Sequence, residues 1–465
     1  MSQWQVQALS EVCGGEPPSG EPFLMAIFAR RIFEIQLGLH VCGMRRILTN
    51  AVSGIKQDNH VLPVVTIFSL GNDSGGIRLV DMSKVRLGII GLGNIGQHHA
   101  SYLAAGKVAG AELIAVASSV AAKREKYLPA AGFADGESLI RSGLVDAVII
   151  ATPHYQHTTL GIKALEQGLH IMVEKPISAH KRDAERLIAV HERKPELVFG
   201  AMFQLRAEPR YLKIKSLLEE GRLGRIVRIS WILTDWFRTE AYYSSGGWRA
   251  TWAGEGGGVL LNQCLHNLDM MHWLLGAPAR VRGFCQFGRF HKIEVEDNVS
   301  AYLEYGDGAT GMFVTSTGEA PGTNRFEIAG TLGRLVLENN RLSWTQNETD
   351  MVEFSRTAGT AFAKPANREE ELPFENADLP HAVLMRNFVN AIREGEPLIA
   401  PGVEGIHSVE LANAMLYSSL IGGTVELPLD GAAYQDRLGQ LISASTLKKH
   451  VVELAGGDFA DSFNR

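Results

Sequence analysis

Three glycines follow a short apolar run with the spacing of a dinucleotide-binding turn. Residues 85–90 are almost wholly apolar, and Gly91, Gly93 and Gly96 follow in G-x-G-x-x-G order before a segment compatible with a helix. The first glycine permits the turn, the second lets the backbone approach a diphosphate, and the third lets helix and strand pack closely. A structural strand-to-helix turn is the alternative. We predict that the diphosphate binds at the helix N-terminus, against Gly91, Gly93, Asn94, Ile95 and Gly96.

A second apolar run ends where a dinucleotide site usually carries an acid for the ribose hydroxyls. Here Ser118 and Ser119 stand at that position, with Lys123 and Arg124 close behind. Because a missing acid leaves room for a 2′-phosphate, we expect the cofactor to be NAD(P), with NADP favoured over NAD. The alternative is that Lys123 and Arg124 simply form a solvated helix face.

Two later strand ends carry polar residues at the edge of the sheet where ligands bind. One strand runs into Thr152, Pro153 and, further on, His157; the next runs into the Glu174-Lys175-Pro176 sequence. The predicted cofactor-binding residues at these two strand ends are Thr152, Pro153, His157, Glu174 and Lys175. Pro176 cannot continue the strand and restricts the residue before it, so the lysine is held at the strand end. Lys175 is therefore a candidate to bind a substrate oxygen or the nicotinamide ribose, and a surface lysine in a turn is the alternative.

The segment 256–276 combines three glycines with a polar stripe on an expected helix. Leu261, Leu265, Leu268 and Leu275 recur at helical spacing, while Asn262, His266 and Asp269 occupy neighbouring positions i, i+4 and i+7. A neutral imidazole near pH 7 can take a proton from an alcohol as a hydride leaves, or return one in the reverse direction. We predict that His266 is the acid/base, rather than a structural histidine.

The segment 234–258 is rich in aromatic and arginine side chains and has little apolar periodicity. Aromatic faces cover the C–H surfaces of sugars, and Arg and Tyr bind hydroxyl or carboxylate groups. The predicted substrate-binding residues are Trp236, Arg238, Tyr242, Trp248 and Arg249, together with Asn262 and His266. Some of these are expected to be packing anchors only, above all Trp248, along with Trp252.

The order of elements predicts an α/β protein with two domains. Strands at 85–90, 112–118, 145–151, 170–173 and 197–200 alternate with helical segments, which predicts a parallel, doubly wound sheet. Later strands at 225–234, 279–287, 295–305, 309–317, 323–329 and 334–338 are separated by hairpin signals such as Gly306-Asp307-Gly308 and Asn339-Asn340, so consecutive strands should be antiparallel. Residues 347–375 are interpreted as a long loop. Helices are expected at 378–394, 405–419 and 434–443.

Composition places the chain among ordinary soluble proteins. Of its 465 residues 45% are hydrophobic and 21% charged, and its net charge of -6 and lack of a basic run argue against general nucleic-acid binding. The four cysteines show neither C-x-x-C pairs nor zinc spacing, so we expect a cytoplasmic protein without a metal. Residues 23–39 are too short and too charged to span a bilayer, and no secretory signal is recognised.

Taken together, these motifs resemble those of the Gfo/Idh/MocA family of NAD(P)-dependent oxidoreductases, over residues 84 to about 440. The resemblance implies a Rossmann domain followed by an α/β domain with a large open, mainly antiparallel sheet that often mediates oligomerisation. It implies sugars, sugar derivatives or inositols as substrates. The predicted catalytic residues are Lys175, His266 and Asn262. Many family members have Asp where this chain has Asn262. An uncharged amide cannot help manage the proton, which leaves this work to His266 with Lys175 as its electrostatic partner.

We accordingly expect an N-terminal extension over residues 1–81, a dinucleotide-binding domain over 82–204, a substrate-binding and oligomerisation domain over 205–440 whose last helices return to the first domain, and a tail over 441–465. One hypothesis is that the natural protein starts at Met82, just before the first strand. Two other functions remain open. Some family members are glycosidases that use bound NAD for transient oxidation, and others are non-catalytic dinucleotide-binding sensors.

Overall fold

The computed structural model describes residues 84–375 and 379–452. The predicted extension over residues 1–81, the start at Met82 and the last part of the predicted tail lie outside the described residues.

Six parallel strands form the first sheet, in the order β3-β2-β1-β4-β5-β6. The order runs outward in both directions from β1, as in a doubly wound dinucleotide-binding fold, so the predicted Rossmann-type sheet is confirmed. The edge strand β3 was not predicted, because three half-buried or exposed residues are too short to give a pattern. The bounds are Val85–Ile90 (β1), Ala111–Ala117 (β2), Ala131–Phe133 (β3), Ala147–Ile150 (β4), His170–Val173 (β5) and Phe199–Ala201 (β6).

Helices connect these strands and bring four chain turns to one edge of the sheet. Because all six strands are parallel, the turns after β1, β2, β4 and β5 lie at their common carboxyl ends. These turns contain Gly91, Ser118, Thr152 and Glu174. The helices are α3 (Asn94–Ala104), α4 (Ala121–Glu125), α5 (Gly136–Ile140), α6 (His154–Glu166) and α7 (Lys181–His191).

Nine strands form the second sheet, in the order β14-β13-β12-β11-β7-β10-β9-β8-β15. The sheet is mainly antiparallel, as predicted, but β7 lies between β10 and β11 and pairs with β10 in parallel. Consecutive strands β10 and β11 are therefore not neighbours, which corrects the simple hairpin order. The bounds are Ile226–Leu233 (β7), Arg280–Phe287 (β8), Glu296–Glu304 (β9), Thr310–Ser316 (β10), Asn324–Gly330 (β11), Gly333–Glu338 (β12), Arg341–Asn347 (β13), Asn367–Leu372 (β14) and Val425–Glu426 (β15).

The two predicted hairpin turns are present. Residues 306–308 join the antiparallel strands β9 and β10, and Asn339 and Asn340 join β12 and β13 with positive φ angles of 51° and 57°. Positive φ at both central residues is the requirement of a type I′ turn. The predicted loop over 347–375 is wrong in part, because it contains α11 (Met351–Thr357) and the edge strand β14. Four charged residues in β14 remove the apolar alternation by which a strand is recognised.

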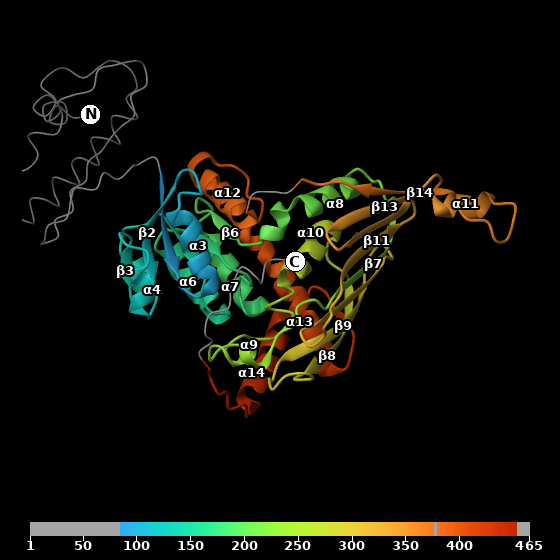
Figure 1. The fold of residues 1–465 in the computed structure, drawn as a ribbon. Coiled ribbons are helices and arrows are strands. Elements are labelled where there is room, and N and C mark those ends of the chain that lie inside the picture. Colours follow the sequence, from blue (N-terminus) through green and yellow to red (C-terminus); the bar gives the residue numbers. More distant parts are fainter. Residues whose placement is uncertain (1–83, 376–378, 453–465) are drawn as a thin grey trace, which may run out of the picture. The chain divides into compact units, whose positions relative to one another are not determined.

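Helices from the middle and the end of the chain pack between the two sheets (Figure 1). Helix α13 contacts both β8 and α7, and a side-chain carbon on Gly283 of β8 would lie 2.2 Å from the carbonyl oxygen of Met415 in α13. Helix α12 returns to contact β1 and η1. The bounds are η1 (Gln204–Ala207), α8 (Pro209–Glu219), α9 (Glu240–Ser244), α10 (Leu265–Leu275), α12 (Pro380–Glu394), η2 (Gly402–Glu404), α13 (Gly405–Ile421) and α14 (Gly431–Ala444).

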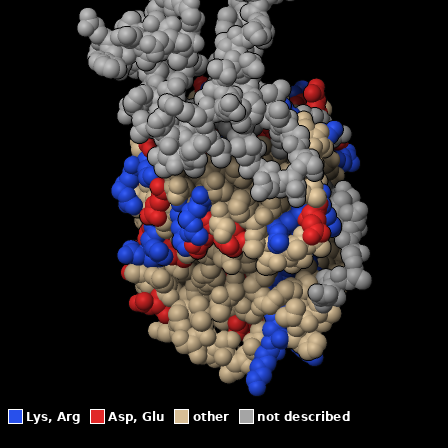
Figure 2. All heavy atoms as spheres, turned by 90° about the vertical axis from the view of Figure 1, so that its left-hand side faces the viewer, with Lys and Arg blue, Asp and Glu red and all other residues tan. Residues whose placement is uncertain are grey.

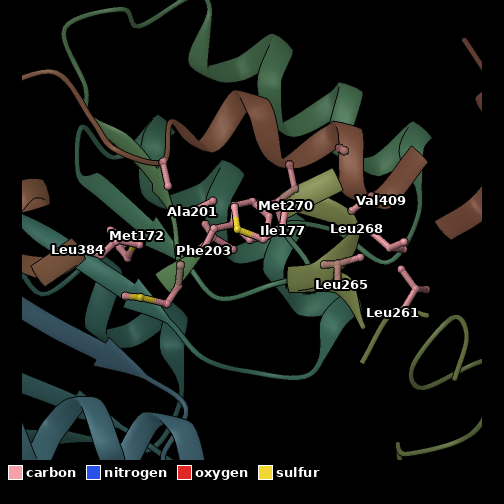
Figure 3. Close-up of a cluster of buried hydrophobic side chains, with 14 of the residues drawn as sticks. Met172, Ile177, Ala201, Phe203, Leu261, Leu265, Leu268, Met270, Leu384 and Val409 are labelled. Carbon is pink, nitrogen blue, oxygen red and sulfur yellow. The ribbon is translucent and has the colours of Figure 1, made fainter. Parts of the chain in front are cut away.

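A continuous buried core joins the end of the first sheet to α10 (Figure 3). Met172 of β5 and Phe203, which follows β6, belong to the same cluster as Leu265 and Leu268 of α10, and each is at most 2% exposed. Interiors of this kind are close-packed, so a shift of one element displaces its neighbours. The core therefore fixes the turn after β5 relative to the start of α10.

Charged side chains of both signs share the described surface. In Figure 2 Lys and Arg atoms lie among Asp and Glu atoms on the face that is drawn. Ion pairs at the surface include Glu137 with Lys163 and with Arg141. Over residues 84–375 and 379–452, no helix is both long and apolar enough to cross a bilayer.

Candidate active site

The three glycines after β1 have three different surroundings. Gly91 adopts φ +95°, and a side-chain carbon there would lie 2.5 Å from the carbonyl oxygen of Ala151. A side-chain carbon on Gly96 would lie 1.9 Å from the carbonyl oxygen of Gly91, so this glycine lets α3 pack against the turn. At Gly93 a side-chain carbon would meet nothing within 4 Å. The open space at Gly93 is what the approach of a diphosphate requires.

The N-terminus of α3 lacks a side-chain cap within the described part of the chain. Gly93 is its N-cap, no side chain caps it, and no acidic residue lies in its first turn. Gly93 and Asn94 are exposed, and Ile95 is half-buried. An uncapped helix N-terminus presents N–H donors and a partial positive charge to an anion. These residues therefore fit the diphosphate of a dinucleotide.

The turn after β2 presents two serines and a tethered arginine. Ser119 is exposed and Ser118 and Lys123 are half-buried. Arg124 donates from Nη1 to the carbonyl oxygen of Ser118 at 2.5 Å, so its guanidinium is held against this turn. The turn thus has hydroxyl groups and two nearby cations where an acid is usual.

The turns after β4 and β5 are tied together by His157. One ring nitrogen lies 2.6 Å from the carbonyl oxygen of Thr152 and the other lies 2.6 Å from that of Pro176. Both nitrogens of His157 are thus engaged by the backbone, which leaves neither for a direct bond to a cofactor. The side-chain oxygen of Thr152 is buried and has no partner among the described residues, and Pro153 is the N-cap of α6. Within this turn, Thr152 has the polar atom free to bind a ligand.

Glu174 is held in place by a hydrogen bond to His99 of α3. Its Oε1 lies 2.6 Å from Nε2 of His99, and the other ring nitrogen of His99 lies 2.6 Å from the hydroxyl of Tyr102. Oε2 of Glu174 accepts from the backbone N–H of Lys175 at 3.1 Å. Burial raises the pKa of Glu174, but the hydrogen bond with His99 and the charges of His99, His381 and Lys175 together outweigh it and lower the pKa to about 2. Glu174 therefore orients the lysine turn, with both oxygens already engaged.

His99 and Tyr102 are contributors that the sequence interpretation missed. Both are buried although each carries a polar group, and they lie three residues apart on the α3 face toward the sheet. Helical spacing from the glycine turn was the available signal, because positions three apart share one face.

Lys175 and the start of α10 come together although they are far apart in sequence. Nζ of Lys175 donates to the backbone carbonyl oxygen of Asn262 at 2.5 Å. His266 lies about one helical turn after Asn262, and its Nε2 lies 3.2 Å from Nε2 of Gln204. Nδ1 of His266 is buried and has no partner among the described residues. Lys175, Asn262 and His266, the predicted catalytic residues, thus occupy one site, to which η1 adds Gln204.

Burial changes the protonation of both catalytic candidates. Desolvation lowers the pKa of His266 well below 6.5, and the positive charge of Lys175 adds to this. Desolvation also lowers the pKa of Lys175, while Glu174 and Glu255 oppose the change. His266 is therefore neutral near pH 7 and can accept a proton.

Asp269 lies on α10 near His266 but points to a different partner. Its two carboxylate oxygens accept from Nε and Nη2 of Arg206 at 2.9 and 2.6 Å, and both side chains are 1% exposed. Arg206 also pairs with Glu404. The polar stripe expected from helical spacing therefore divides, with Asn262 and His266 in the site and Asp269 joining α10 to η1.

The predicted substrate residues form a ladder of rings and guanidinium groups. The guanidinium carbons of Arg238 and Arg249 lie over the Tyr242 ring, at 5.0 and 4.7 Å from its centroid. The Tyr242 hydroxyl accepts from Arg249 Nη1 at 2.8 Å and from Gln263 Nε2 at 3.0 Å. Since Gln263 is adjacent to Asn262, this contact joins the ladder to the catalytic segment.

Two tryptophans extend the ladder. Arg238 lies 5.1 Å from the Trp236 ring and Arg249 lies 4.7 Å from the Trp248 ring. Trp248 also packs edge-on against His154, with 5.4 Å between ring centroids. Trp252 is 5% exposed and belongs to the core.

Over residues 84–375 and 379–452, no cluster of three or more His, Cys, Asp or Glu side chains is arranged to hold a metal.

Two consecutive segments of the chain match known protein-family models. Residues 85–201 match a family model described as an oxidoreductase family, NAD-binding Rossmann fold, and residues 211–336 match the GFO/IDH/MocA C-terminal domain. The 1,5-anhydro-D-fructose reductase of Ensifer adhaerens is 25% identical over 74% of this chain and 98% of its own length. Inositol 2-dehydrogenase of Rhizobium meliloti is 26% identical over 72% of this chain and 96% of its own. Among solved structures, the WlbA dehydrogenase from Bordetella pertussis in complex with NADH and UDP-GlcNAcA aligns with a TM-score of 0.63 at 25% identity, over 75% of this chain and 100% of that one.

Proposed function

The chain belongs to the Gfo/Idh/MocA family of oxidoreductases, and on this basis we propose that it transfers a hydride between a nicotinamide cofactor and a hydroxyl-bearing carbon of a sugar, sugar derivative or inositol-like polyol. It is a dehydrogenase or reductase of CH–OH groups with a NAD-binding Rossmann fold. Relatives that are named as sugar and inositol dehydrogenases or reductases support this substrate class.

One observation carries the proposal, namely the convergence of Lys175 and His266 beside the predicted dinucleotide turn. The lysine donates to the carbonyl oxygen of Asn262, and the neutral imidazole has a buried nitrogen with no partner in the described part of the chain. A lysine ammonium has three donors, so Lys175 retains two for a substrate oxygen. A donor and a proton acceptor are thus available to one substrate hydroxyl.

The residues divide the work of alcohol oxidation between them. The bound nicotinamide supplies hydride chemistry. His266 accepts the hydroxyl proton, and the Lys175 ammonium stabilises the negative charge that develops on the substrate oxygen. In the reverse direction Lys175 polarises the carbonyl group and the imidazolium of His266 returns the proton. Because burial lowers the His266 pKa, its neutral form is favoured near pH 7, which supports the base role.

The ladder around Tyr242 supports a polar, ring-shaped substrate. Arg238 and Arg249 lie over its ring, and Trp236 and Trp248 extend the aromatic surface. We infer that these five side chains bind the sugar or polyol ring and its hydroxyl groups, next to Asn262 and His266.

The turn after β2 favours NADP. Ser118 and Ser119 leave the position of the usual acid uncharged, and Lys123 and Arg124 lie close behind. A 2′-phosphate would accept hydrogen bonds from the serines and be attracted by the cations. Fluorescence titration should therefore give a lower Kd for NADP than for NAD, and Ser119→Asp should reverse the order. Tighter NAD binding by the unchanged protein would refute the NADP preference.

The direct test of function is a screen of sugars, sugar acids and inositols with NAD and NADP separately. A stoichiometric rise in reduced-nicotinamide absorbance with a keto or lactone product is the expected result. Release of a free sugar with no net absorbance change would instead identify a glycosidase that uses transient oxidation. Dinucleotide binding with no turnover of any compound, in either direction, would favour a sensor.

The uncovered face of the second sheet supports assembly with further copies of the chain. Phe284, Tyr302 and Met312 are 57%, 41% and 52% exposed on β8, β9 and β10. The register places them on one face, opposite the helices α8, α10 and α13 (Figure 1). Exposed apolar patches of this kind mark interaction sites. Light scattering should show a homo-oligomer that Met312→Lys weakens, and a monomer at all concentrations would refute this.

A further inference from the structure

Glu255 carries a buried carboxylate that the proposed reaction leaves without a role. The residue is 2% exposed and lies just before the three glycines that lead to α10. Its Oε2 accepts from the backbone N–H of Ala250 at 2.5 Å, and its Oε1 accepts from the side-chain amide of Asn262. Its carbonyl oxygen lies 3.0 Å from Nδ1 of His154, at the start of α6. One residue thus ties three separate segments together.

The Ala250 contact holds a turn in an unfavourable conformation. Ala250 adopts φ +53°, a left-handed region that is unfavourable for a residue with a side-chain carbon. The carboxylate of Glu255 accepts a hydrogen bond from the backbone N–H of Ala250. The same turn places the preceding residue, Arg249, over the ring of Tyr242. Backbone strain of this kind persists only where surrounding contacts determine it, and it is concentrated at functional sites.

The Asn262 contact connects Glu255 to the catalytic lysine. The side chain of Asn262 donates to Glu255, while its backbone carbonyl accepts from Nζ of Lys175 at 2.5 Å. Asn262 itself is uncharged. The negative charge that is linked to the lysine through Asn262 is therefore that of Glu255.

We propose that Glu255 is a positioning residue for hydride transfer, whose carboxylate fixes the Lys175 ammonium through Asn262 and balances its charge. The proposal rests on the proposed function, because it assigns Lys175 to the substrate oxygen. Glu255 is not assigned a contact with the substrate oxygen or with the hydride donor. It acts through the residue that accepts the lysine hydrogen bond.

The groups around the pair are of both signs. Those that act electrostatically with Lys175 are Glu174 at its own strand end, Glu255 and Arg249 from the loop, Cys264 and His266 near and on α10, His154 and His157 on α6, and His381 on α12. The charged and titratable groups that interact electrostatically with Glu255 include Arg249, Lys449, Glu296 and Tyr243. Glu174 and Glu255 are the two carboxylates that raise the Lys175 pKa, and burial and Arg249 lower it. Removing the charge of Glu255 should therefore lower it further.

The test measures the protonation of Lys175 directly in the full chain. Competitive acetylation with acetic anhydride, followed by peptide mass spectrometry from pH 7 to 11, reports the midpoint at which the partly exposed Lys175 becomes reactive. In Glu255→Gln this midpoint should fall by about one pH unit, the lower end of the effect of a nearby opposite charge. The double variant Glu255→Gln/Asn262→Asp transfers the negative charge from residue 255 to its hydrogen-bond partner, residue 262, and should restore the midpoint.

A matched control is Glu294→Gln. Glu294 also accepts from a backbone N–H in this region, that of Trp252 at 2.8 Å, but it does not contact Asn262. Its removal should leave the Lys175 midpoint unchanged. Thermal melting and dinucleotide binding show which variants are folded. If Glu255→Gln does not fold, the double variant decides, since a wild-type midpoint supports the proposal and a lowered one refutes it.

An unchanged Lys175 midpoint in folded Glu255→Gln would overturn the proposal, whatever its activity. In contrast, a wild-type chain that oxidises no sugar or polyol, but whose Lys175 midpoint still falls in Glu255→Gln, would refute the proposed function and support the coupling of the two residues. With an active substrate, the alkaline limb of the kcat/KM profile should move with the acetylation midpoint in every variant.

Discussion

Replacement of Asp269 should affect stability much more than chemistry. Asp269→Asn removes the charge that pairs with Arg206 in a site where both side chains are 1% exposed. Breaking such a buried pair costs about 3–5 kcal/mol, and we expect the lower end, ~3 kcal/mol, because Arg206 still pairs with Glu404. With an unfolding entropy of ~2.1 cal/mol/K per residue over roughly 370 described residues, the melting temperature should fall by about 4 °C.

Differential scanning calorimetry and turnover per folded molecule separate the two effects. Turnover should stay within several-fold of the unchanged protein, because the carboxylate of Asp269 faces Arg206 rather than His266. The double variant Arg206→Leu/Asp269→Leu removes both charges and should recover part of the lost stability. A variant Asp269→Asn with an unchanged melting temperature but with turnover reduced 100-fold would refute this reasoning and place Asp269 in the reaction.

Three further predictions follow from the same contacts. His266→Gln should lower turnover by about 100-fold or more while dinucleotide affinity changes little, and near-full activity in a steady-state assay would remove His266 from the mechanism. Gly93→Ala should keep the melting temperature but raise the dinucleotide Kd roughly 10-fold or more. Gly96→Ala should lower the melting temperature, because its side-chain carbon would lie 1.9 Å from a backbone oxygen. Equal stability of the two variants would contradict the geometry. Burial lowers the pKa of His381 to about 3, so the unfolded chain binds a proton below pH 6.5 that the folded chain does not. The free energy of unfolding should therefore fall by about 1.4 kcal/mol per pH unit from this group as the pH drops from 6.5 toward 3, and His381→Gln should reduce the slope in urea titrations at pH 7, 6 and 5.

The first sheet could be predicted because its longer strands are mainly apolar runs, each followed by a helix. The second sheet could be predicted only in part. Its hairpins have local signals in Gly306–Gly308 and Asn339–Asn340, but the insertion of β7 between β10 and β11 depends on pairing between segments about 80 to 100 residues apart. Strand β14 escaped prediction because a charged edge strand lacks apolar alternation.

The sequence by itself determined the family, the parallel sheet with its glycine turn, and the residue types that carry the proposed chemistry. These properties are local, since spacing along one strand or helix sets which side chains share a face. Only the tertiary structure decided which polar residues meet. Lys175 contacts Asn262, which lies 87 positions later in the chain. His157 contacts the backbone of Pro176 and Glu174 contacts His99, so both support the site. Asp269 pairs with Arg206. The tertiary structure also placed Glu255 behind Asn262, because buried polar groups must find hydrogen-bond partners, and those partners come from whatever the fold packs beside them.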